Sequence, residues 1–398
     1  MKIALAYSGG LDTSVAIKWL KEKYGASIIC VYADVGQGED ILKIDKRAIA
    51  SGASKVYVSD LKEKFINEFV FPALKAGAVY EKGYLLATAL SRPLIVWELA
   101  RVAVIEKCGS AAHGCTGKGN DQVRFEVGIS TLAPHLEVIA PVREWELGSR
   151  DEEIEYAKEH GIPVDVTKKS PYSIDRNLWG ISIEAGVLED PWKEPPEDAY
   201  QITKSPQAAP NKPAYLVISF EKGVPVKLDG KRMKPSSLIC KVAKIGGAHG
   251  VGRVDMVENR LVGIKSHEIY ELPAATILNT AHKELEGLVL DRETAHYKEL
   301  VSQKYSELVY YGLWYTPLKK ALDAFVNETQ KYVTGDVRVK LYKGTCAVAG
   351  RKSPYSLYNY KLATYDKGST FDQKLAKGFI ELWGLPYKIR AQALKRNR

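Results

Sequence analysis

The chain has 398 residues, of which 45% are hydrophobic and 26% are charged, so it can bury a large core and is expected to form two domains rather than a disordered chain. Its net charge of +9 raises the possibility of nucleic-acid binding, but the basic residues are interleaved with acidic ones, which argues against a basic nucleic-acid-binding module. The five cysteines form no C-x-x-C pair, which argues against a disulfide framework or a structural zinc site, and no stretch resembles a signal peptide or a membrane span, so we expect a cytoplasmic protein without a membrane partner.

The first part of the chain alternates between strand and helix patterns. Short β-branched or aromatic runs predict strands at residues 2–7, 27–33 and 55–59, a strand ending at residues 111–114, and a strand at residues 136–140. Helical spacing of apolar residues predicts helices at residues 13–24, 39–51, 61–76, 93–107 and 149–160. This alternation predicts an α/β fold with a parallel sheet covered on both faces, and ligands at the carboxyl ends of its strands.

A phosphate-binding loop is predicted at residues 8–14, between the first strand and the first helix. Two adjacent glycines allow positive φ, Ser8, Thr13 and Ser14 add hydroxyl donors, and Asp12 is expected to cap the helix. The spacing fits neither a Walker loop nor a dinucleotide fingerprint. It resembles the pyrophosphate loop of the N-type ATP pyrophosphatases, although a bare Gly-Gly pair is also common in ordinary turns.

A second glycine-rich run lies at residues 113–126 and carries several polar side chains. Thr116, Asn120, Asp121 and Arg124 supply a hydroxyl, an amide, a carboxylate and a guanidinium within one segment. This mixture suits a zwitterion, because Asp121 can accept from an ammonium group and Arg124 can bind a carboxylate. If a helix begins near Asn120, then Asn120 and Arg124 lie on one face. The alternative is a glycine-rich connection followed by a capped helix.

The second half of the chain has a different pattern. Six prolines predict a surface loop or linker at residues 190–213. Strands are predicted at residues 215–220 and 224–228, Asp229 and Gly230 form a strong hairpin signal, and helices are predicted at residues 236–245, 274–288 and 291–310. We therefore expect a second domain that mixes antiparallel strands with helices.

The two polar runs together resemble the argininosuccinate synthetase family. Further runs similar to that family are residues 33–38, 84–86, 91–95, 171–175, 188–192, 249–253, 257–260 and 307–312. The resemblance implies an α/β nucleotide-binding domain of the ATP pyrophosphatase type at residues 1–165, an α+β synthetase and multimerisation domain at residues 166–365, and a C-terminal helical oligomerisation arm at residues 366–398.

The resemblance implies an enzyme of arginine biosynthesis. Such an enzyme condenses citrulline and aspartate to argininosuccinate, converts ATP to AMP and pyrophosphate, and forms a citrullyl-adenylate. A ureido carbon is a poor electrophile, so its oxygen must first attack the α-phosphorus of ATP. This chemistry depends mainly on positioning and on charge stabilisation. The implied cofactor is ATP with Mg²⁺, whose protein ligands the sequence does not identify.

The resemblance also implies the site residues, position by position. The ATP-binding residues are Ala6, Tyr7, Ser8, Gly9, Gly10, Leu11, Asp12, Thr13, Ser14, Ala33 and Gly114, with Asp12 and Ser14 as catalytic candidates. The aspartate-binding residues are Thr116, Asn120 and Asp121. The citrulline-binding residues are Tyr84, Thr88, Asn120, Arg124, Ser173, Ser182, Glu258 and Tyr270. The sequence departs from the family at Ala89, where many relatives have Ser, and Thr88 is expected to compensate.

Two other functions compete with this interpretation. One is another ATP pyrophosphatase, such as a tRNA thiolase or a glutamine-dependent amidotransferase. Thiolation would require paired reactive cysteines, and a glutaminase would require an N-terminal Cys nucleophile or a preceding domain. The other is a basic nucleic-acid-binding module, which a steep salt dependence of affinity would reveal.

An apolar stripe is predicted near the C-terminus, after a hinge at residues 367–369. Its members recur at helical spacing and are Phe371, Leu375, Phe379, Leu382 and Trp383. One possibility is that this helix folds back onto its own second domain. The family resemblance implies instead a homotetramer in which C-terminal arms reach neighbouring subunits.

Overall fold

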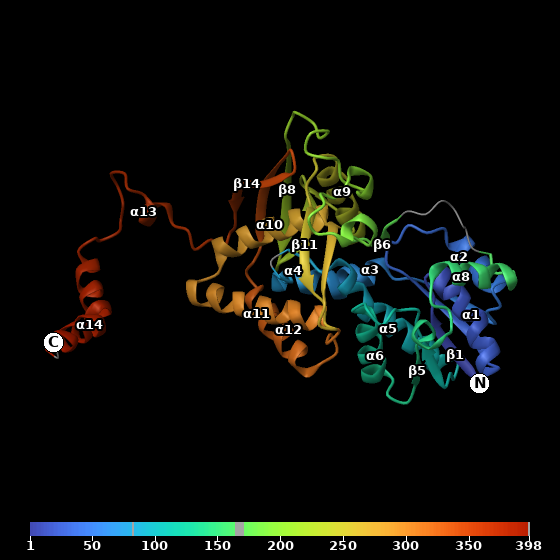
Figure 1. Ribbon diagram of the computed structural model, residues 1–398. Helices are drawn as coiled ribbons and strands as arrows, with labels where there is room; N and C mark the ends of the chain where they lie inside the picture. Colours follow the sequence, from blue (N-terminus) through green and yellow to red (C-terminus); the bar gives the residue numbers. More distant parts are fainter. Residues whose placement is uncertain (82, 164–170, 397–398) are drawn as a thin grey trace. The chain divides into compact units, whose positions relative to one another are not determined.

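The computed structural model describes residues 1–81, 83–163 and 171–396. The chain forms two compact units, Met1–Tyr355 and Ser356–Arg398 (Figure 1). The domain boundary predicted between residues 165 and 166 falls outside the described residues. Within the described ranges, no helix has the length and apolar character needed to cross a membrane.

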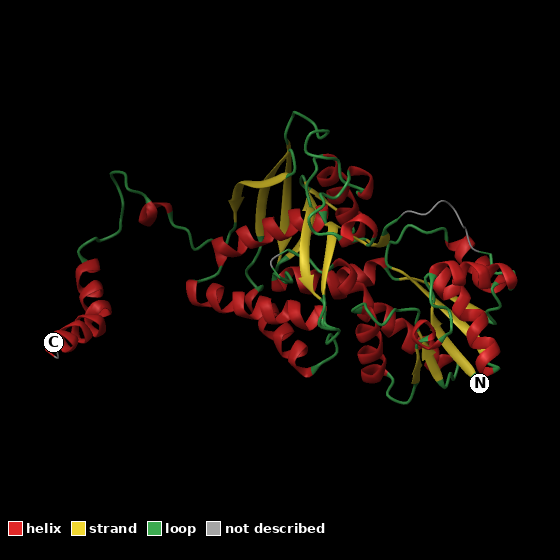
Figure 2. Cartoon of the chain, in the orientation of Figure 1, coloured by secondary structure: helices red, strands yellow, loops and turns green. Residues whose placement is uncertain are grey.

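The N-terminal part of the first unit contains the predicted parallel sheet, in the order β3-β2-β1-β4-β5 (Figure 2). Its strands are β1 (Lys2–Ala6), β2 (Ser27–Asp34), β3 (Lys55–Asp60), β4 (Ser110–Ala112) and β5 (Glu137–Ile139). Its helices are α1 (Leu11–Tyr24), α2 (Ile41–Ala50), α5 (Ala87–Ile105), α6 (Asp121–Leu132), α7 (Pro141–Glu144) and α8 (Arg150–Glu159). The five predicted strands and the α/β fold class are confirmed.

Both faces of this sheet are buried, as β1 illustrates. Ile3 and Leu5 belong to an apolar cluster with residues of α1, α2 and α8. Ala4 and Ala6 alternate with them and belong to a second cluster with residues of α5 and α6. Since side chains alternate between the two faces of a strand, this single short run contributes to both apolar layers.

Two predicted helices differ from the observed ones in detail. The helix predicted at residues 93–107 is α5, which begins earlier, at Ala87. The prediction placed Pro93 in the first turn, where proline is most common, but Pro93 lies inside the helix. The helix predicted at residues 61–76 is divided into α3 (Lys62–Phe65), the π-helical turn η1 (Ile66–Val70) and α4 (Phe71–Ala76).

The remainder of the first unit contains two antiparallel sheets. One has the order β10-β9-β8-β13-β14 and the other β11-β12-β7-β6. The first consists of β8 (Ala214–Glu221), β9 (Val224–Leu228), β10 (Lys231–Arg232), β13 (Gly335–Tyr342) and β14 (Thr345–Lys352). The second consists of β6 (Ser173–Asn177), β7 (Gly180–Glu184), β11 (Arg253–Asn259) and β12 (Lys265–Glu271). The short 3-10 helix η2 (Gly186–Glu189) directly precedes the predicted linker, and η3 (Glu197–Ala199) lies within it.

This part of the first unit also contains four longer helices, and three of them were predicted. They are α9 (Pro235–Ala248), α10 (Pro273–Val289), α11 (Arg292–Tyr310) and the unpredicted α12 (Pro317–Thr329). The predicted hairpin is confirmed, because Asp229 and Gly230 join β9 to β10 in antiparallel register. The sequence interpretation missed strands β6, β7 and β11–β14.

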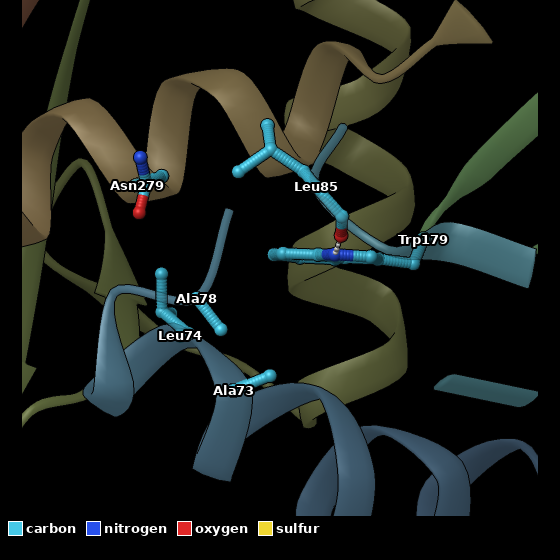
Figure 3. Close-up of a pocket in the computed structure, with 6 residues that line it drawn as sticks. All are labelled: Ala73, Leu74, Ala78, Leu85, Trp179 and Asn279. Atoms are coloured by element: carbon cyan, nitrogen blue, oxygen red, sulfur yellow. Dashed lines mark hydrogen bonds between the residues drawn. The ribbon is translucent and has the colours of Figure 1, made fainter. Parts of the chain in front are cut away.

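The β6–β7 hairpin is attached to the segment that precedes α5. Trp179, in the turn of the hairpin, donates from Nε1 to the carbonyl of Leu85 at 2.9 Å (Figure 3). The neighbouring cavity is bordered by Ala73, Leu74, Ala78, Leu85, Trp179 and Asn279. It has a volume of about 10 Å³, which is room for about one water molecule, so it is too small for a substrate.

The second unit contains α13 (Tyr360–Ala363) and α14 (Leu375–Arg396). The predicted apolar residues of this unit are exposed, with fractions from 54% for Phe371 to 74% for Leu382. Phe379 and Trp383 stack on each other with ring centroids 5.7 Å apart, as expected one helical turn apart. The predicted stripe is therefore present and solvent-facing, except that Phe371 precedes the helix.

Candidate active site

The predicted phosphate loop lies at the point where the strand order of the parallel sheet reverses. β1 ends at Ala6 and α1 begins at Leu11, so the loop occupies the carboxyl end of the central strand. β2 pairs with one edge of β1 and β4 pairs with the other, which makes the gap between β1 and β4 the topological switch point. Open α/β sheets bind ligands at this position.

Hydroxyl groups cross-link the loop to the first turn of α1. Ser8 Oγ lies 3.0 Å from Thr13 Oγ1, and the Tyr7 hydroxyl lies 3.0 Å from Ser14 Oγ. Ser14 is fully buried. The expected capping by Asp12 is wrong: Gly10 is the N-cap, without a side-chain cap, and Asp12 lies in the first turn. The N–H groups at this helix end therefore have no side-chain cap competing with an anion.

Two glycines permit close approach around the loop. Gly9 has φ +81°, and a Cβ there would lie 2.2 Å from Ile44 Cδ1 of α2. A Cβ at Gly114 would lie 2.9 Å from Thr13 Cγ2, so the run after β4 packs directly on the phosphate loop. Arg47 of α2 donates to the carbonyl of Gly9 and brings positive charge to the same place.

A pair of carboxyl groups lies beside the loop. Asp12 of α1 is hydrogen-bonded to Glu153 of α8. Burial and the charge of Asp12 raise the pKa of Glu153 to about 8, because two adjacent carboxylates resist ionising together. In the described part of the chain, no group of three or more His, Cys, Asp or Glu side chains could hold a metal ion.

Ala33 lies near the carboxyl end of β2, beside the loop. It is buried, and its carbonyl accepts from Gln37 Nε2 at 2.8 Å. The same Gln37 accepts from the backbone N–H of Val35 at 2.8 Å. The short turn after β2 is thus fixed by its own side chains, which holds the predicted adenosine contact at the same edge of the sheet as the loop.

The first turn of α6 presents three of the predicted amino-acid-binding residues. Asn120 is the N-cap residue, so the expected helix start is confirmed. Asn120 and Arg124 are buried on one face of the helix. Asp121 lies between them and accepts from Arg124 Nη1 at 2.7 Å.

Arg92 of α5 connects this turn to the four-stranded sheet. It donates to one oxygen of Asp121 at 3.0 and 2.7 Å and also forms an ion pair with Asp175 of β6. Burial alone would raise the pKa of Asp121, but the charges of Arg92 and Arg124 outweigh that effect and hold the pKa below its usual range. Asp121 is therefore a carboxylate held between two guanidinium groups.

One face of the four-stranded sheet carries predicted citrulline residues. In the register of the sheet, Ser182 of β7 lies opposite both Tyr270 of β12 and Asp175 of β6. Residues two apart along a strand share a face, so Glu258, Glu268 and Ser173 fall on this face too. The opposite face contributes Ile181, Ile183 and Ile269 to a separate apolar cluster. This division of faces aligns the polar residues toward α5, α6 and α11.

Glu258 is the centre of a buried hydrogen-bond network. It is 1% exposed and accepts from the hydroxyls of Tyr270, at 2.5 Å, and of Tyr310 in α11. The Tyr270 hydroxyl also lies 2.8 Å from Glu268. Burial and the charge of Glu268 raise the pKa of Glu258 to about 7, although the two hydroxyls and Arg124 favour its ionised form. A carboxylate in this setting can pair with a ligand ammonium group.

Tyr84 and Thr88 complete the network at the start of α5. The Tyr84 hydroxyl accepts from the backbone N–H groups of Thr88, at 2.9 Å, and of Ala89, at 3.2 Å. The Tyr84 ring stacks on Tyr270 with centroids 4.2 Å apart. Thr88 Oγ1 lies 2.6 Å from Ser182 Oγ, so a hydroxyl from α5 reaches the sheet even though position 89 has none.

The structure thus brings most of the predicted residues into two adjacent groups. The first group surrounds the loop and includes residues 6–14, Ala33 and Gly114. The second includes Tyr84, Thr88, Asn120, Asp121, Arg124, Ser182, Glu258 and Tyr270. Thr116 and Ser173 are exposed and lie outside the second network, although Ser173 shares a strand face with Asp175.

Sequence reasoning missed several residues that organise the second group. They are Arg92, Asp175, Glu268 and Tyr310. Arg92 could have been found from the sequence, because it is the only charged residue in the mostly apolar stretch 87–97. A charged side chain in such a stretch predicts a buried partner of opposite charge. Tyr310 lies in the family-like run at residues 307–312, but no signal there distinguishes it from its neighbour Tyr311.

Comparisons with known proteins found similarity along almost the whole chain. A protein-family model described as "Arginosuccinate synthase N-terminal HUP domain" matches residues 2–163, and one described as "Arginosuccinate synthase C-terminal domain" matches residues 172–390. An argininosuccinate synthase of Pelodictyon phaeoclathratiforme is 60% identical over 391 residues, 98% of each chain. One of Chlorobium phaeobacteroides is 59% identical, covering 100% of this chain and 99% of its own. One of Caldanaerobacter subterraneus is 59% identical over 98% of this chain and 95% of its own.

Proposed function

The chain belongs to the argininosuccinate synthase family, and from this premise we propose how its residues divide the reaction between the two groups of the site. The activity is that of argininosuccinate synthase, an AMP-forming ligase of arginine biosynthesis that depends on ATP. The residue roles, the adenylate intermediate, the metal and the assembly described below are proposals.

In the first proposed step, the ureido oxygen of citrulline attacks the α-phosphorus of ATP. A citrullyl-adenylate forms, and pyrophosphate leaves. Residues 6–14 would hold the triphosphate, with Ala33 and Gly114 at the nucleotide. The position of the loop at the switch point, the positive φ of Gly9 and the helix start at Leu11 support this role. The hydroxyl contacts to Thr13 and Ser14 would fix the donors before ATP arrives.

The carboxyl pair beside the loop fits a magnesium ion that accompanies ATP. Mg²⁺ usually keeps several waters and binds one or two carboxylates together with substrate phosphates, so it does not need a larger protein cluster. Asp12 and Glu153 would supply those carboxylates. The bound ion would neutralise charge on the phosphates.

In the second proposed step, the aspartate amine attacks the activated ureido carbon and AMP leaves with the former ureido oxygen. Thr116, Asn120 and Asp121 would hold aspartate. The low pKa of Asp121 supports this role, because the group stays anionic and can accept from the substrate ammonium. Arg92 and Arg124 keep that carboxylate in position.

Citrulline would lie against the polar face of the four-stranded sheet. Its contacts would be Tyr84, Thr88, Asn120, Arg124, Ser173, Ser182, Glu258 and Tyr270. Arg124 offers a fork for the carboxylate, and Glu258 offers an anion for the ammonium group. The short contact between Thr88 and Ser182 supports Thr88 as the hydroxyl that stands in for the one missing at Ala89.

The single observation that carries the proposal is the path from Gly114 to Arg124. Gly114 packs on Thr13 of the phosphate loop, and ten residues later Arg124 lies in the amino-acid cluster. One short segment therefore joins the place where ATP would be activated to the place where the amino acids would be held. The two chemical steps require that proximity.

We also propose the division into residues 1–165, 166–365 and 366–398, and a homotetramer in which the last of these segments joins subunits. The exposed apolar stripe on α14 supports the assembly, because an apolar surface of this kind is usually covered by a partner. We place the enzyme in the cytoplasm, where ATP is available and where its five free thiols stay reduced.

A pyrophosphate-release assay tests the order of steps. We expect pyrophosphate release from ATP only when citrulline is present, and we expect aspartate alone to give none. Release without citrulline would contradict activation of the citrulline oxygen.

A further inference from the structure

We infer that Tyr310 is a positioning residue that holds the aspartate and citrulline subsites in one geometry. The inference rests on the proposed substrate sites and adds a residue that lies outside them in the sequence. Tyr310 is the last residue of α11 and is completely buried.

Its hydroxyl joins one group from each subsite. Asn120 Nδ2 donates to the Tyr310 hydroxyl at 2.8 Å, and that hydroxyl donates to Glu258. The other amide atom of Asn120 accepts from the backbone N–H of Leu261 at 2.8 Å. Both ends of the Asn120 amide are therefore fixed, and its orientation depends on the tyrosine.

The rest of Tyr310 positions Arg124. The Tyr310 carbonyl accepts from Arg124 Nε at 2.9 Å, and the guanidinium lies 4.8 Å from the centre of the ring. A Cβ at Gly312 would lie 2.7 Å from Arg124 Cα, so the end of α11 is pressed against the first turn of α6. Tyr310 thus contacts Asn120, Arg124 and Glu258 at once.

Rigid neighbours hold the tyrosine itself. Its ring stacks on Tyr80 with centroids 3.6 Å apart and planes 8° apart, and it meets Tyr84 edge-on at 6.2 Å. The Tyr80 hydroxyl donates to the carbonyl of Asn259, next to Glu258. An aromatic stack of this kind leaves the hydroxyl little freedom to move.

The hydroxyl also affects the ionisation of Glu258. Hydrogen bonds to a carboxylate favour its charged form and lower its pKa. The groups that act on Glu258 are Tyr270 and Glu268 of β12, Arg124 of α6, Tyr310 of α11, and Tyr80 and Tyr84 before α5. Removing the Tyr310 hydroxyl leaves burial and Glu268 less opposed, so the pKa of Glu258 rises further.

The test is Tyr310→Phe, which keeps the ring and removes the hydroxyl. We expect the KM values for citrulline and aspartate each to rise about tenfold or more, because Glu258 loses a hydrogen bond to its carboxylate and the Asn120 amide loses its acceptor. The ATP KM should stay unchanged. We also expect the low-pH limb of the citrulline kcat/KM profile to move to higher pH.

The chain offers a matched control in Tyr305→Phe. Tyr305 lies on the same helix, is fully buried, and donates to a carboxylate, Asp323, at 2.8 Å. A purely structural effect of losing a buried hydroxyl would appear in both variants as a lower Tm. Unchanged amino-acid KM values and an unshifted pH profile in Tyr310→Phe would overturn the inference.

Glu258→Gln separates this inference from the assignment of the sites. If Glu258→Gln raises the citrulline KM and Tyr310→Phe behaves like Tyr305→Phe, only the role of Tyr310 is wrong. If Glu258→Gln leaves the citrulline KM unchanged, the proposed citrulline site itself is wrong.

Discussion

The phosphate loop and the amino-acid cluster are built in different ways. The loop is one short segment between β1 and α1, and in the proposed site its contacts to ATP would come mainly from backbone N–H groups that glycines make accessible. The cluster joins side chains from five or more elements, and the hydrogen bond between Asn120 and Tyr310 spans 190 positions. In the proposed site, recognition by the loop would therefore depend on backbone conformation, whereas recognition by the cluster would depend on charged side chains that other charged side chains hold in place.

Removing Asp121 should break the cluster most severely. Asp121→Ala deletes the carboxylate that would bind the aspartate ammonium and leaves Arg92 and Arg124 without their common partner. We expect apparent aspartate affinity to fall by roughly 2–5 kcal/mol, with ATP binding little changed. Initial rates with each substrate varied in turn give the comparison.

A suitable control is Asp323→Ala, which also removes a carboxylate from an ion pair, the one that Asp323 forms with Lys319. It should lower the Tm without changing the aspartate KM. An unchanged aspartate KM in Asp121→Ala would show that the assignment of Asp121 is wrong.

Arg92→Lys tests the geometry of the cluster at constant charge. Arg92 reaches Asp121 and Asp175 together, and an ammonium group cannot reproduce that fork. We expect a loss of about 1.5–3 kcal/mol in aspartate affinity, measured from kcat/KM. Arg101→Lys on the same helix alters a similar two-point contact, with Glu98, outside the site and should leave kcat/KM unchanged. Equal behaviour of the two variants would mean that charge alone suffices at position 92.

Gly9→Ala tests the loop through its backbone. A side chain at Gly9 meets both a positive φ and the side chain of Ile44, so we expect unfolding free energy to fall by about 1–3 kcal/mol and the ATP KM to rise. Gly25 also has a positive φ but has open space around its Cα. Gly25→Ala should therefore lower stability by only about 1 kcal/mol and leave the ATP KM alone. An ATP KM that stays at the wild-type value in Gly9→Ala would contradict the role of the loop.

Truncation after Ser369 should have the smallest effect on catalysis. It removes α14 and the whole exposed stripe, while both groups of the site lie within Met1–Tyr355. We expect a smaller assembly by light scattering and an ATP site that still folds. A truncated protein that stays tetrameric would show that the stripe does not join subunits.

The same contrast explains what could be predicted from the sequence. The strand, glycine and helix signals of residues 2–24 are adjacent in the chain, so local chemistry was sufficient to predict a phosphate loop there. The β11–β12 hairpin was missed because its strand pattern is interrupted by charged residues such as Glu258 and Glu268. Their burial depends in part on residues far away in the sequence, such as Tyr310 of α11, which donates to Glu258. The capping role expected of Asp12 failed because α1 begins at Leu11, which makes Gly10 the N-cap residue and places Asp12 inside the first turn.

Oxygen tracing most directly tests the claim that the loop activates an atom held by the cluster. Citrulline labelled with oxygen-18 in the ureido group should transfer its label to the phosphate of AMP in a complete reaction, because the ureido oxygen attacks the α-phosphorus and leaves with it. Label found in pyrophosphate or in water, with none in AMP, would contradict the account.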